Sequence, residues 1–218
     1  MKQETIIAPS LLAADFRNLE RKVGRINHSA AEWVHFDVMD GVAVPNISFG
    51  FPVLEALRAL TDKFIDVHLM IENPSKFFGE FKKMGANHLT IHFEGNNNLK
   101  QDLIQIRELG MSAGLVLNPD TDIQVIEPYL SYIDLLLIMS VFPGFGGQKF
   151  IEATFEKVRC AKDIISKSGF NIPIQVDGGV SVENSKQLIE GGADVLVSGS
   201  ALFKAPDFSA YVLALKTA

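Results

Sequence analysis

The stretch Gly191-Gly-Ala-Asp-Val-Leu-Val-Ser-Gly-Ser200 contains the unit from which the fold can be predicted. Its first two glycines stand where a helix is expected to end, because glycine adopts the left-handed conformation that closes many helices. The apolar run 194–198 follows, and its valines are typical of a strand. The turn Gly199-Ser200 then leads toward another helix. The stretch therefore predicts a helix, a strand and a helix joined by short glycine turns.

Seven further runs of this kind are spread along the chain. These seven runs are residues 5–8, 33–38, 64–69, 88–92, 112–117, 134–139 and 172–176, and 194–198 is the eighth. Their spacing is that of strand–helix–strand units, which predicts parallel strands rather than hairpins. Eight such units favour an α/β fold closed into a (β/α)8 barrel, the TIM-barrel type. No Gly-x-Gly-x-x-Gly turn follows the first run, which weakens the dinucleotide-binding alternative.

The stretches between the runs have helical periodicity and recognisable ends. After Asp15, one apolar stripe predicts a helix: Phe16, Leu19, Val23 and Ile26. Pro52 and Pro74 each stand at the first turn of another helix, and Gly85 and Gly110 stand where C-terminal caps are needed. No linker or low-complexity segment interrupts this order. We therefore expect residues 1–218 to form a single (β/α)8 barrel domain.

The composition excludes several classes of protein. The chain has 218 residues and a formal net charge of −6, without a basic stripe, which argues against nucleic-acid binding. No apolar run is long enough to cross a bilayer, and the N-terminal residues lack a signal-peptide pattern. These features predict a cytoplasmic protein that does not bind membranes. An anionic substrate would have to be held by local hydrogen-bond donors.

Polar side chains stand near the ends of several predicted strands, where barrel enzymes carry their reactive groups. Period-two alternation puts His35 and Asp37 on one face of the second strand, His68 lies near the end of the third, and Asp177 ends the seventh. Either histidine alone is more simply explained as a hydrogen-bonded core residue. Together, two imidazoles and two carboxylates favour one divalent metal ion (Zn²⁺, Fe²⁺, Mn²⁺ or Co²⁺), because a bare cluster of charges would repel itself. His92 is more simply explained as closing a turn.

Glycine-rich turns follow the last three predicted strands. They comprise Gly144, Phe145, Gly146 and Gly147 after the sixth, Gly178 and Gly179 after the seventh, and Gly199 and Ser200 after the eighth. Backbone N–H groups in such turns can approach an anion closely. The last two turns lead into predicted helices, whose N-termini favour negative charge. One such turn could be a mere connection, but three adjacent ones predict a phosphate site.

Six segments resemble the signature segments of the ribulose-phosphate 3-epimerase family. They are Ala8-Pro-Ser-Leu-Leu-Ala-Ala-Asp15, His35-Phe-Asp-Val-Met-Asp-Gly41, Asp66-Val-His-Leu-Met70, Met139-Ser-Val-Phe-Pro-Gly-Phe-Gly-Gly-Gln148, Val176-Asp-Gly-Gly179 and Gly199-Ser200. The resemblance runs in order from about residue 6 to residue 203. It implies a barrel of the ribulose-phosphate-binding type.

The resemblance also implies roles for individual residues. His35, Asp37, His68 and Asp177 would bind the metal, with Asp37 and Asp177 as the acid/base pair. Ser10 and His68 would contact the substrate, a small sugar phosphate, beside three methionines: Met39, Met70 and Met139. Methionine is usually core filler, but a shared position at strand ends favours a polarisable wall that excludes water. The resemblance and the apolar helix faces also favour a homo-oligomer.

The implied reaction is epimerisation at C3, which interconverts D-ribulose 5-phosphate and D-xylulose 5-phosphate, as in the pentose phosphate pathway. A proton next to a carbonyl is removed and another is returned to the opposite face, so two bases on opposite sides are needed. The enediolate formed in between carries charge on O2 and O3, which a chelated metal ion would stabilise.

Three other functions stay open: an allulose-6-phosphate 3-epimerase acting on a hexulose, a phosphate-binding barrel lyase, and a sugar-phosphate binder without catalysis. Three places depart from the family pattern, namely Phe142, Val42-Ala43, and Phe93 after His92. None of them is a metal ligand or a catalytic acid. They lie in loops expected to cover the sugar, so they leave the choice between pentulose and hexulose open.

Overall fold

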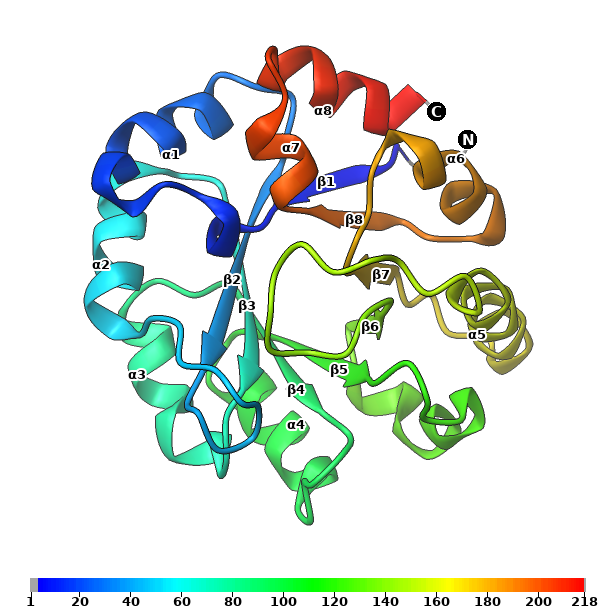
Figure 1. Ribbon diagram of the computed structural model, residues 1–218. Helices are drawn as coiled ribbons and strands as arrows, with labels where there is room; N and C mark the ends of the chain where they lie inside the picture. Colours follow the sequence, from blue (N-terminus) through cyan, green and yellow to red (C-terminus); the bar gives the residue numbers. More distant parts are fainter. Residues whose placement is uncertain (1–3, 218) are drawn as a thin grey trace.

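In the computed structural model, which describes residues 4–217, eight parallel strands form a ring surrounded by helices (Figure 1). The strands are β1 (Ile6–Pro9), β2 (Trp33–Met39), β3 (Phe64–Met70), β4 (His88–His92), β5 (Ser112–Leu117), β6 (Leu135–Met139), β7 (Ile174–Asp177) and β8 (Val195–Ser198). They pair in the order β1-β8-β7-β6-β5-β4-β3-β2. A further bridge, between Ser10 and His35, joins the β1 edge to β2. The predicted (β/α)8 barrel is confirmed.

The helices lie outside the ring and bury their apolar faces against it. The α-helices are α1 (Leu19–Asn27), α2 (Phe51–Leu60), α3 (Phe78–Lys83), α4 (Leu99–Glu108), α5 (Thr154–Ser168), α6 (Val182–Gly191), α7 (Ser200–Lys204) and α8 (Phe208–Thr217). Short 3₁₀ helices cover Leu11–Ala13, Phe16–Asn18, Pro74–Phe77 and Ile123–Tyr132. Fully buried side chains such as Val34 of β2 and Leu54 of α2 form the core between the two layers. No helix within residues 4–217 is long and apolar enough to cross a membrane.

The predicted strands match the observed ones to within two residues. The runs 88–92 and 112–117 are β4 and β5 without any change. The largest difference is at β7, which begins at Ile174 rather than at residue 172. Pro173 precedes it, and proline has no N–H group to donate to a strand ladder.

The helix prediction was right at the C-terminal ends and wrong at two starts. Gly85, Gly110 and Gly192 have φ angles of 91°, 75° and 110°, the left-handed conformation expected of helix caps. The helix predicted at Pro74 begins with a 3₁₀ turn, so α3 starts only at Phe78. The helix predicted after Asp15 likewise begins with a 3₁₀ turn, and α1 starts only at Leu19. Phe16 belongs to this turn and is 40% exposed, outside the buried stripe.

Two groups of side chains, one apolar and one polar, fill the interior of the barrel. The apolar group includes Ala8, Val116, Leu135, Leu137 and Val195. Strands β2, β3, β4 and β7 instead contribute buried polar residues: His35, Asp66, His88, Thr90 and Gln175. Gln175 Nε2 donates to Asp66 Oδ2 at 2.5 Å, although β7 and β3 are not neighbours in the sheet. Both side chains therefore point into the barrel.

Gly114 of β5 packs against His88 and Thr90 of the polar group, which leave no room for a side chain at this position. An added Cβ would overlap Thr90 Oγ1 and His88 Nε2. We expect Gly114→Ala to lower the free energy of unfolding by about 1–3 kcal/mol, the usual cost of overfilling a packed interior. Gly24→Ala in α1 is the matched control, because a Cβ there meets no atom within 4 Å. It should be neutral or stabilising by up to about 1 kcal/mol. Urea denaturation of both variants checks this, and equal stabilities would contradict it.

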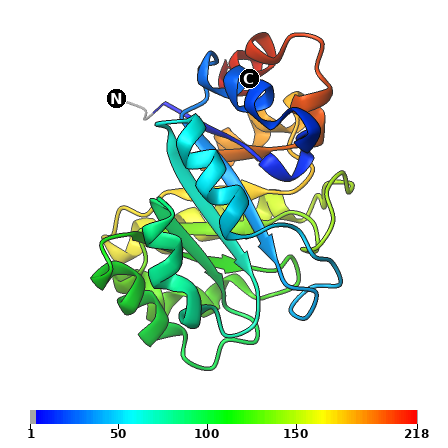
Figure 2. The same ribbon diagram turned by 90° about the vertical axis from the view of Figure 1, so that its left-hand side faces the viewer.

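The loops that follow the C-terminal ends of the strands share one end of the barrel. Figure 2 shows the loops after β2 and β6 projecting from the same end of the molecule. In Figure 1 the loop after β6 passes across the mouth of the ring. This end is where barrel enzymes place their active sites.

Candidate active site

Four residues predicted from the sequence meet at this mouth: His35 and Asp37 of β2, His68 of β3 and Asp177 of β7. Each offers one ligand atom, and these four atoms all lie within 4.8 Å of one another. His35 Nε2 is 3.1 Å from Asp37 Oδ1 and 3.8 Å from Asp177 Oδ2. His68 Nδ1 is 3.2 Å from Asp37 Oδ1. The closed ring therefore gathers two nitrogen and two oxygen donors from three strands.

This donor set fits a divalent cation. Ligand atoms bound tetrahedrally at about 2.1 Å from one ion lie about 3.4 Å apart, close to the spacings found here. Mixed imidazole and carboxylate donors suit Zn²⁺, Fe²⁺, Mn²⁺ and Co²⁺.

The charges of the cluster also favour a cation. Burial and the neighbouring Asp37 carboxylate raise the pKa of Asp177 to about 7. Burial opposes the protonation of His35, but the carboxylates of Asp37 and Asp66 raise its pKa well above the usual value. At Asp37, His35 and His68 outweigh the effect of burial and hold the pKa of the carboxyl group below its usual range. Near neutral pH the metal-free cluster therefore holds protons on His35 and on part of the Asp177 carboxyl groups, and a bound cation would replace them.

The raised pKa of Asp177 predicts a pH-dependent cost to the metal-free protein. Asp177 ionises near pH 4 when unfolded but only near pH 7 when folded, so its contribution to stability falls as the pH rises through this window. We expect metal-free Asp177→Asn to melt a few degrees higher than metal-free wild type at pH 8, with a smaller difference at pH 5. Thermal melts after chelation check this, with the exposed Asp163→Asn as control. A lower Tm for Asp177→Asn at pH 8 would contradict the prediction.

Two buried residues behind His35 were missed in the sequence. Asp66 Oδ2 accepts from His35 Nδ1 at 2.7 Å, and Gln175 Nε2 donates to the same oxygen. This pairing turns His35 Nε2 toward Asp37 and Asp177. A signal was available, because Asp66 stands two residues before His68 and Gln175 two residues before Asp177. The alternation that singled out His35 and Asp37 applies to them equally.

His92 has a larger part in the site than closing a turn. Its Nε2 lies 2.9 Å from His68 Nε2, and the two rings stack with centroids 5.0 Å apart. His92 Nδ1 in turn lies 3.1 Å from Glu94 Oε2. The sequence-based explanation of His92 missed this contact, because nothing local links the end of β4 to the third strand.

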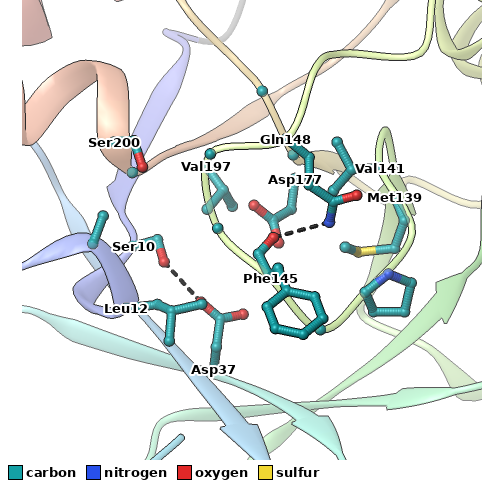
Figure 3. Close-up of a pocket in the computed structure, with 18 of the residues that line it drawn as sticks. Ser10, Leu12, Asp37, Met139, Val141, Phe145, Gln148, Asp177, Val197 and Ser200 are labelled. Carbon is teal, nitrogen blue, oxygen red and sulfur yellow. Dashed lines mark hydrogen bonds between the residues drawn. The ribbon is translucent and has the colours of Figure 1, made fainter. Parts of the chain in front are cut away.

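A cavity of about 250 Å³ adjoins the cluster. Figure 3 shows Asp37 and Asp177 on its wall, with Met139 and Phe145 nearby. Ser10 Oγ donates to Asp37 Oδ2 at 2.7 Å. The lining includes twelve of the residues predicted to bind substrate: Ser10, Met39, Met70, Met139, Gly144, Phe145, Gly146, Gly147, Gly178, Gly179, Gly199 and Ser200. His68 is fully buried and lies outside the lining.

The three glycine turns converge on this cavity. Gly178, with a φ of 117°, packs so closely on the loop after β6 that an added Cβ would come within 2.9 Å of Val141 N. A Cβ on Gly147 would lie 3.5 Å from Ser200 Oγ, so the turns after β6 and β8 also meet. Of the two helix N-termini predicted to face a phosphate, only that of α7 reaches the lining. On the α6 side the lining ends at Val180, before the helix begins.

The departures from the family pattern lie away from the two carboxylates. Phe142 and Val42 are 51% and 65% exposed, and neither lines the cavity. Phe93 packs edge-on against Tyr129 on the outer side of the sheet. Ala43 lines a second cavity of about 500 Å³. The side chains of Phe142 and Val42 therefore face solvent, and the expectation that their loops cover the sugar stays a prediction.

Fold and site together define an enzyme of the (β/α)8-barrel class with a candidate metal centre. The sequence profile of the ribulose-phosphate 3 epimerase family matches residues 6–203. The chain belongs to this family, and the predicted isomerase class is confirmed.

Curated relatives agree over almost the whole chain. A ribulose-phosphate 3-epimerase of Synechocystis sp. is 44% identical and aligns with 96% of this chain and 92% of its own length. One of Bacillus subtilis is also 44% identical, over 92% and 93%. Among solved structures, a tryptophan synthase α-subunit of Pyrococcus furiosus superposes with a TM-score of 0.71 over 99% of this chain and 97% of its own. At 18% identity, this last likeness concerns the fold alone.

Proposed function

We propose that the chain, acting as a single barrel domain, interconverts D-ribulose 5-phosphate and D-xylulose 5-phosphate by epimerisation at C3. The observation that carries the proposal is the position of Asp37 and Asp177. They come from β2 and β7 and both line one cavity into which three glycine turns open. The names of the relatives, at 44% identity, support the pentulose.

Asp37 and Asp177 are the proposed acid/base pair. In each direction one carboxylate removes the C3 proton and the other, in its protonated form, returns a proton to the opposite face. In the metal-free site the two groups already differ, because histidines keep Asp37 ionised while burial and Asp37 raise the pKa of Asp177 to about 7. Of the two carboxyl groups, Asp177 therefore holds a proton more readily, which suits the acid of the pair. Ser10 holds the Asp37 carboxylate from the side of β1.

The metal ligands of the proposal are His35, Asp37, His68 and Asp177. A divalent cation bound there supplies Lewis-acid stabilisation of the negative charge that develops on O2 and O3 of the substrate. The protein supplies fixed donors for it, since three of the four side chains are buried and Asp66 orients His35.

The remaining lining residues exclude water and hold the phosphate. Met39, Met70 and Met139 are 5%, 2% and 2% exposed and offer apolar, polarisable surface with no competing donor. Such a wall protects a carbanion-like intermediate from stray protonation. The glycine turns at Gly178 and Gly199 bring backbone N–H groups to the other side of the cavity, where a phosphate would bind.

The proposal is tested by supplying two substrates to the purified, metal-loaded protein. We expect turnover of ribulose 5-phosphate to exceed that of allulose 6-phosphate at least about 10-fold in kcat/KM, an energy difference of roughly 1.4 kcal/mol. We also expect the C3 hydrogen to exchange with deuterated solvent. A preference for the hexulose would support the allulose-6-phosphate epimerase, carbon–carbon cleavage would support a lyase, and binding without exchange would leave a binder. Cytoplasmic location, homo-oligomeric assembly and the pathway stay predictions.

A further inference from the structure

The imidazole of His68 continues into a chain of hydrogen bonds that leads away from the proposed metal centre. His68 Nδ1 faces the cluster, 3.2 Å from Asp37 Oδ1. On its other side, Nε2 is 2.9 Å from His92 Nε2, and His92 Nδ1 is 3.1 Å from Glu94 Oε2. Hydrogen-bond contacts thus connect four side chains in series, from β2, β3, β4 and the loop after β4: Asp37, His68, His92 and Glu94.

The Glu94 carboxylate, at the end of this series of hydrogen bonds, determines which imidazole nitrogens of His92 and His68 carry a proton. An ionised carboxylate can only accept, so His92 Nδ1 carries the proton given to Glu94. The Nε2 atom of neutral His92 then accepts, and His68 Nε2 must donate to it. His68 Nδ1 is left with its lone pair pointing at the cluster, which is the form that a metal ligand requires.

We propose that Glu94 is a positioning residue for the metal centre, which fixes the tautomer and orientation of His68 through His92. This inference rests on the proposed function in one respect, namely that His68 is a metal ligand. It adds His92 and Glu94, which lie outside the four-ligand cluster and line the second cavity of about 500 Å³ rather than the one that contains Asp37 and Asp177.

The surroundings of Glu94 keep its charge in place. Its Oε1 accepts from the backbone N–H of Asn118 at 2.8 Å and from the hydroxyl of Thr121. Lys157 Nζ, from α5, clamps this loop by donating to the carbonyls of Asn118 and Thr121, both at 2.6 Å. Burial alone would raise the pKa of Glu94, but the bonds from His92, Thr121 and Asn118 lower it to about 2. The carboxylate is therefore both ionised and held.

The two histidines of the cluster are supported in parallel ways. Behind His35, Asp66 accepts directly from Nδ1 at 2.7 Å. Behind His68, the imidazole of His92 lies between the ligand and the carboxylate of Glu94. Glu94 therefore corresponds to Asp66, but it acts through His92. A carboxylate behind a ligating imidazole raises its basicity, and its loss typically costs roughly 10–100-fold in metal affinity. Glu94 gives His68 the same support from a greater distance.

The test measures Co²⁺ affinity and does not depend on activity. Co²⁺ binding to purified protein is titrated against a competing chelator and followed by the visible absorption of the bound ion. We expect Glu94→Gln and His92→Phe each to weaken Co²⁺ binding about 10–100-fold. The double variant should be no weaker than His92→Phe alone, because Glu94 acts only through His92. The Tm of each variant shows whether it is folded. If His92→Phe does not fold, the Co²⁺ affinity of Glu94→Gln alone tests the proposal.

Thr121→Val is the matched control. It removes the hydroxyl bond to Glu94 Oε1 but leaves the Glu94–His92–His68 chain intact. Affinity close to that of wild type supports the proposal, whereas a loss as large as that of Glu94→Gln would show that Glu94 merely holds its loop. Additive losses in the double variant, or unchanged affinity in Glu94→Gln, overturn the positioning role alone. Wild type that binds no Co²⁺ overturns the metal centre and this inference together.

Discussion

Replacement of Asp37 by asparagine is expected to lower kcat/KM for ribulose 5-phosphate at least about 10³-fold. The amide of an asparagine cannot take up a proton, so one of the two proton transfers loses its base. The same change removes the negative charge beside the two imidazoles, since Asp37 Oδ1 lies 3.1 Å from His35 Nε2 and 3.2 Å from His68 Nδ1. Acid/base chemistry and the metal centre are therefore damaged together.

Steady-state kinetics and exchange of the C3 hydrogen with deuterated solvent check this expectation. Asp163→Asn on the exposed side of α5 is the control for a lost carboxylate. It should keep both turnover and exchange. If Asp37→Asn folds, loads metal and still exchanges the C3 hydrogen at the rate of wild type, Asp37 is not one of the two bases.

Removal of the divalent cation by a chelator is expected to reduce turnover at least about 10³-fold, because charge on O2 and O3 would then develop without Lewis-acid stabilisation. Zn²⁺, Fe²⁺, Mn²⁺ or Co²⁺ should restore activity. Ca²⁺ should not, since it prefers a shell made of oxygen ligands, whereas half of the donors here are imidazole nitrogens.

Elemental analysis adds a measurement independent of turnover. We expect one metal ion per chain in wild type and a large loss in His68→Gln. His28→Gln is the matched control, because His28 is exposed and lies at the C-terminal end of α1, away from the cluster. Full activity of protein shown to be free of metal would rule out the metal-dependent mechanism.

The candidate site illustrates how far local patterns reach. Alternation along 33–39 was enough to put His35 and Asp37 on one face, and the structure places both inside the barrel. The same alternation along β3 and β7 puts Asp66 and Gln175 on the inward face, but alternation does not show that residues of these two strands will be in contact. Their bond spans the interior and exists only because the sheet closes.

The exposure of individual aromatic side chains was harder to predict. Phe16 continues a helical stripe on paper, yet the first turn after Asp15 is a 3₁₀ turn that leaves its ring 40% exposed. Phe142 stands in a loop that borders the cavity, yet its ring points to solvent. Loop conformations depend on contacts such as that of Asn46 Nδ2 with the carbonyl of Gly144, at 2.6 Å, which join segments distant in sequence.

The sequence by itself determined the alternation of strands and helices, the glycine caps and the identity of the residues at the strand ends, because these follow from interactions between residues a few positions apart. Only the tertiary structure decided that His92 lies against His68, that Glu94 stands behind it, and that α7 rather than α6 reaches the cavity. The contact between His68 and His92 spans 24 residues, and the contacts that hold Glu94 reach Asn118 and Thr121, 24 and 27 residues further on. Their geometry is set by the closure of the barrel and the packing of its loops. No local periodicity encodes such distances.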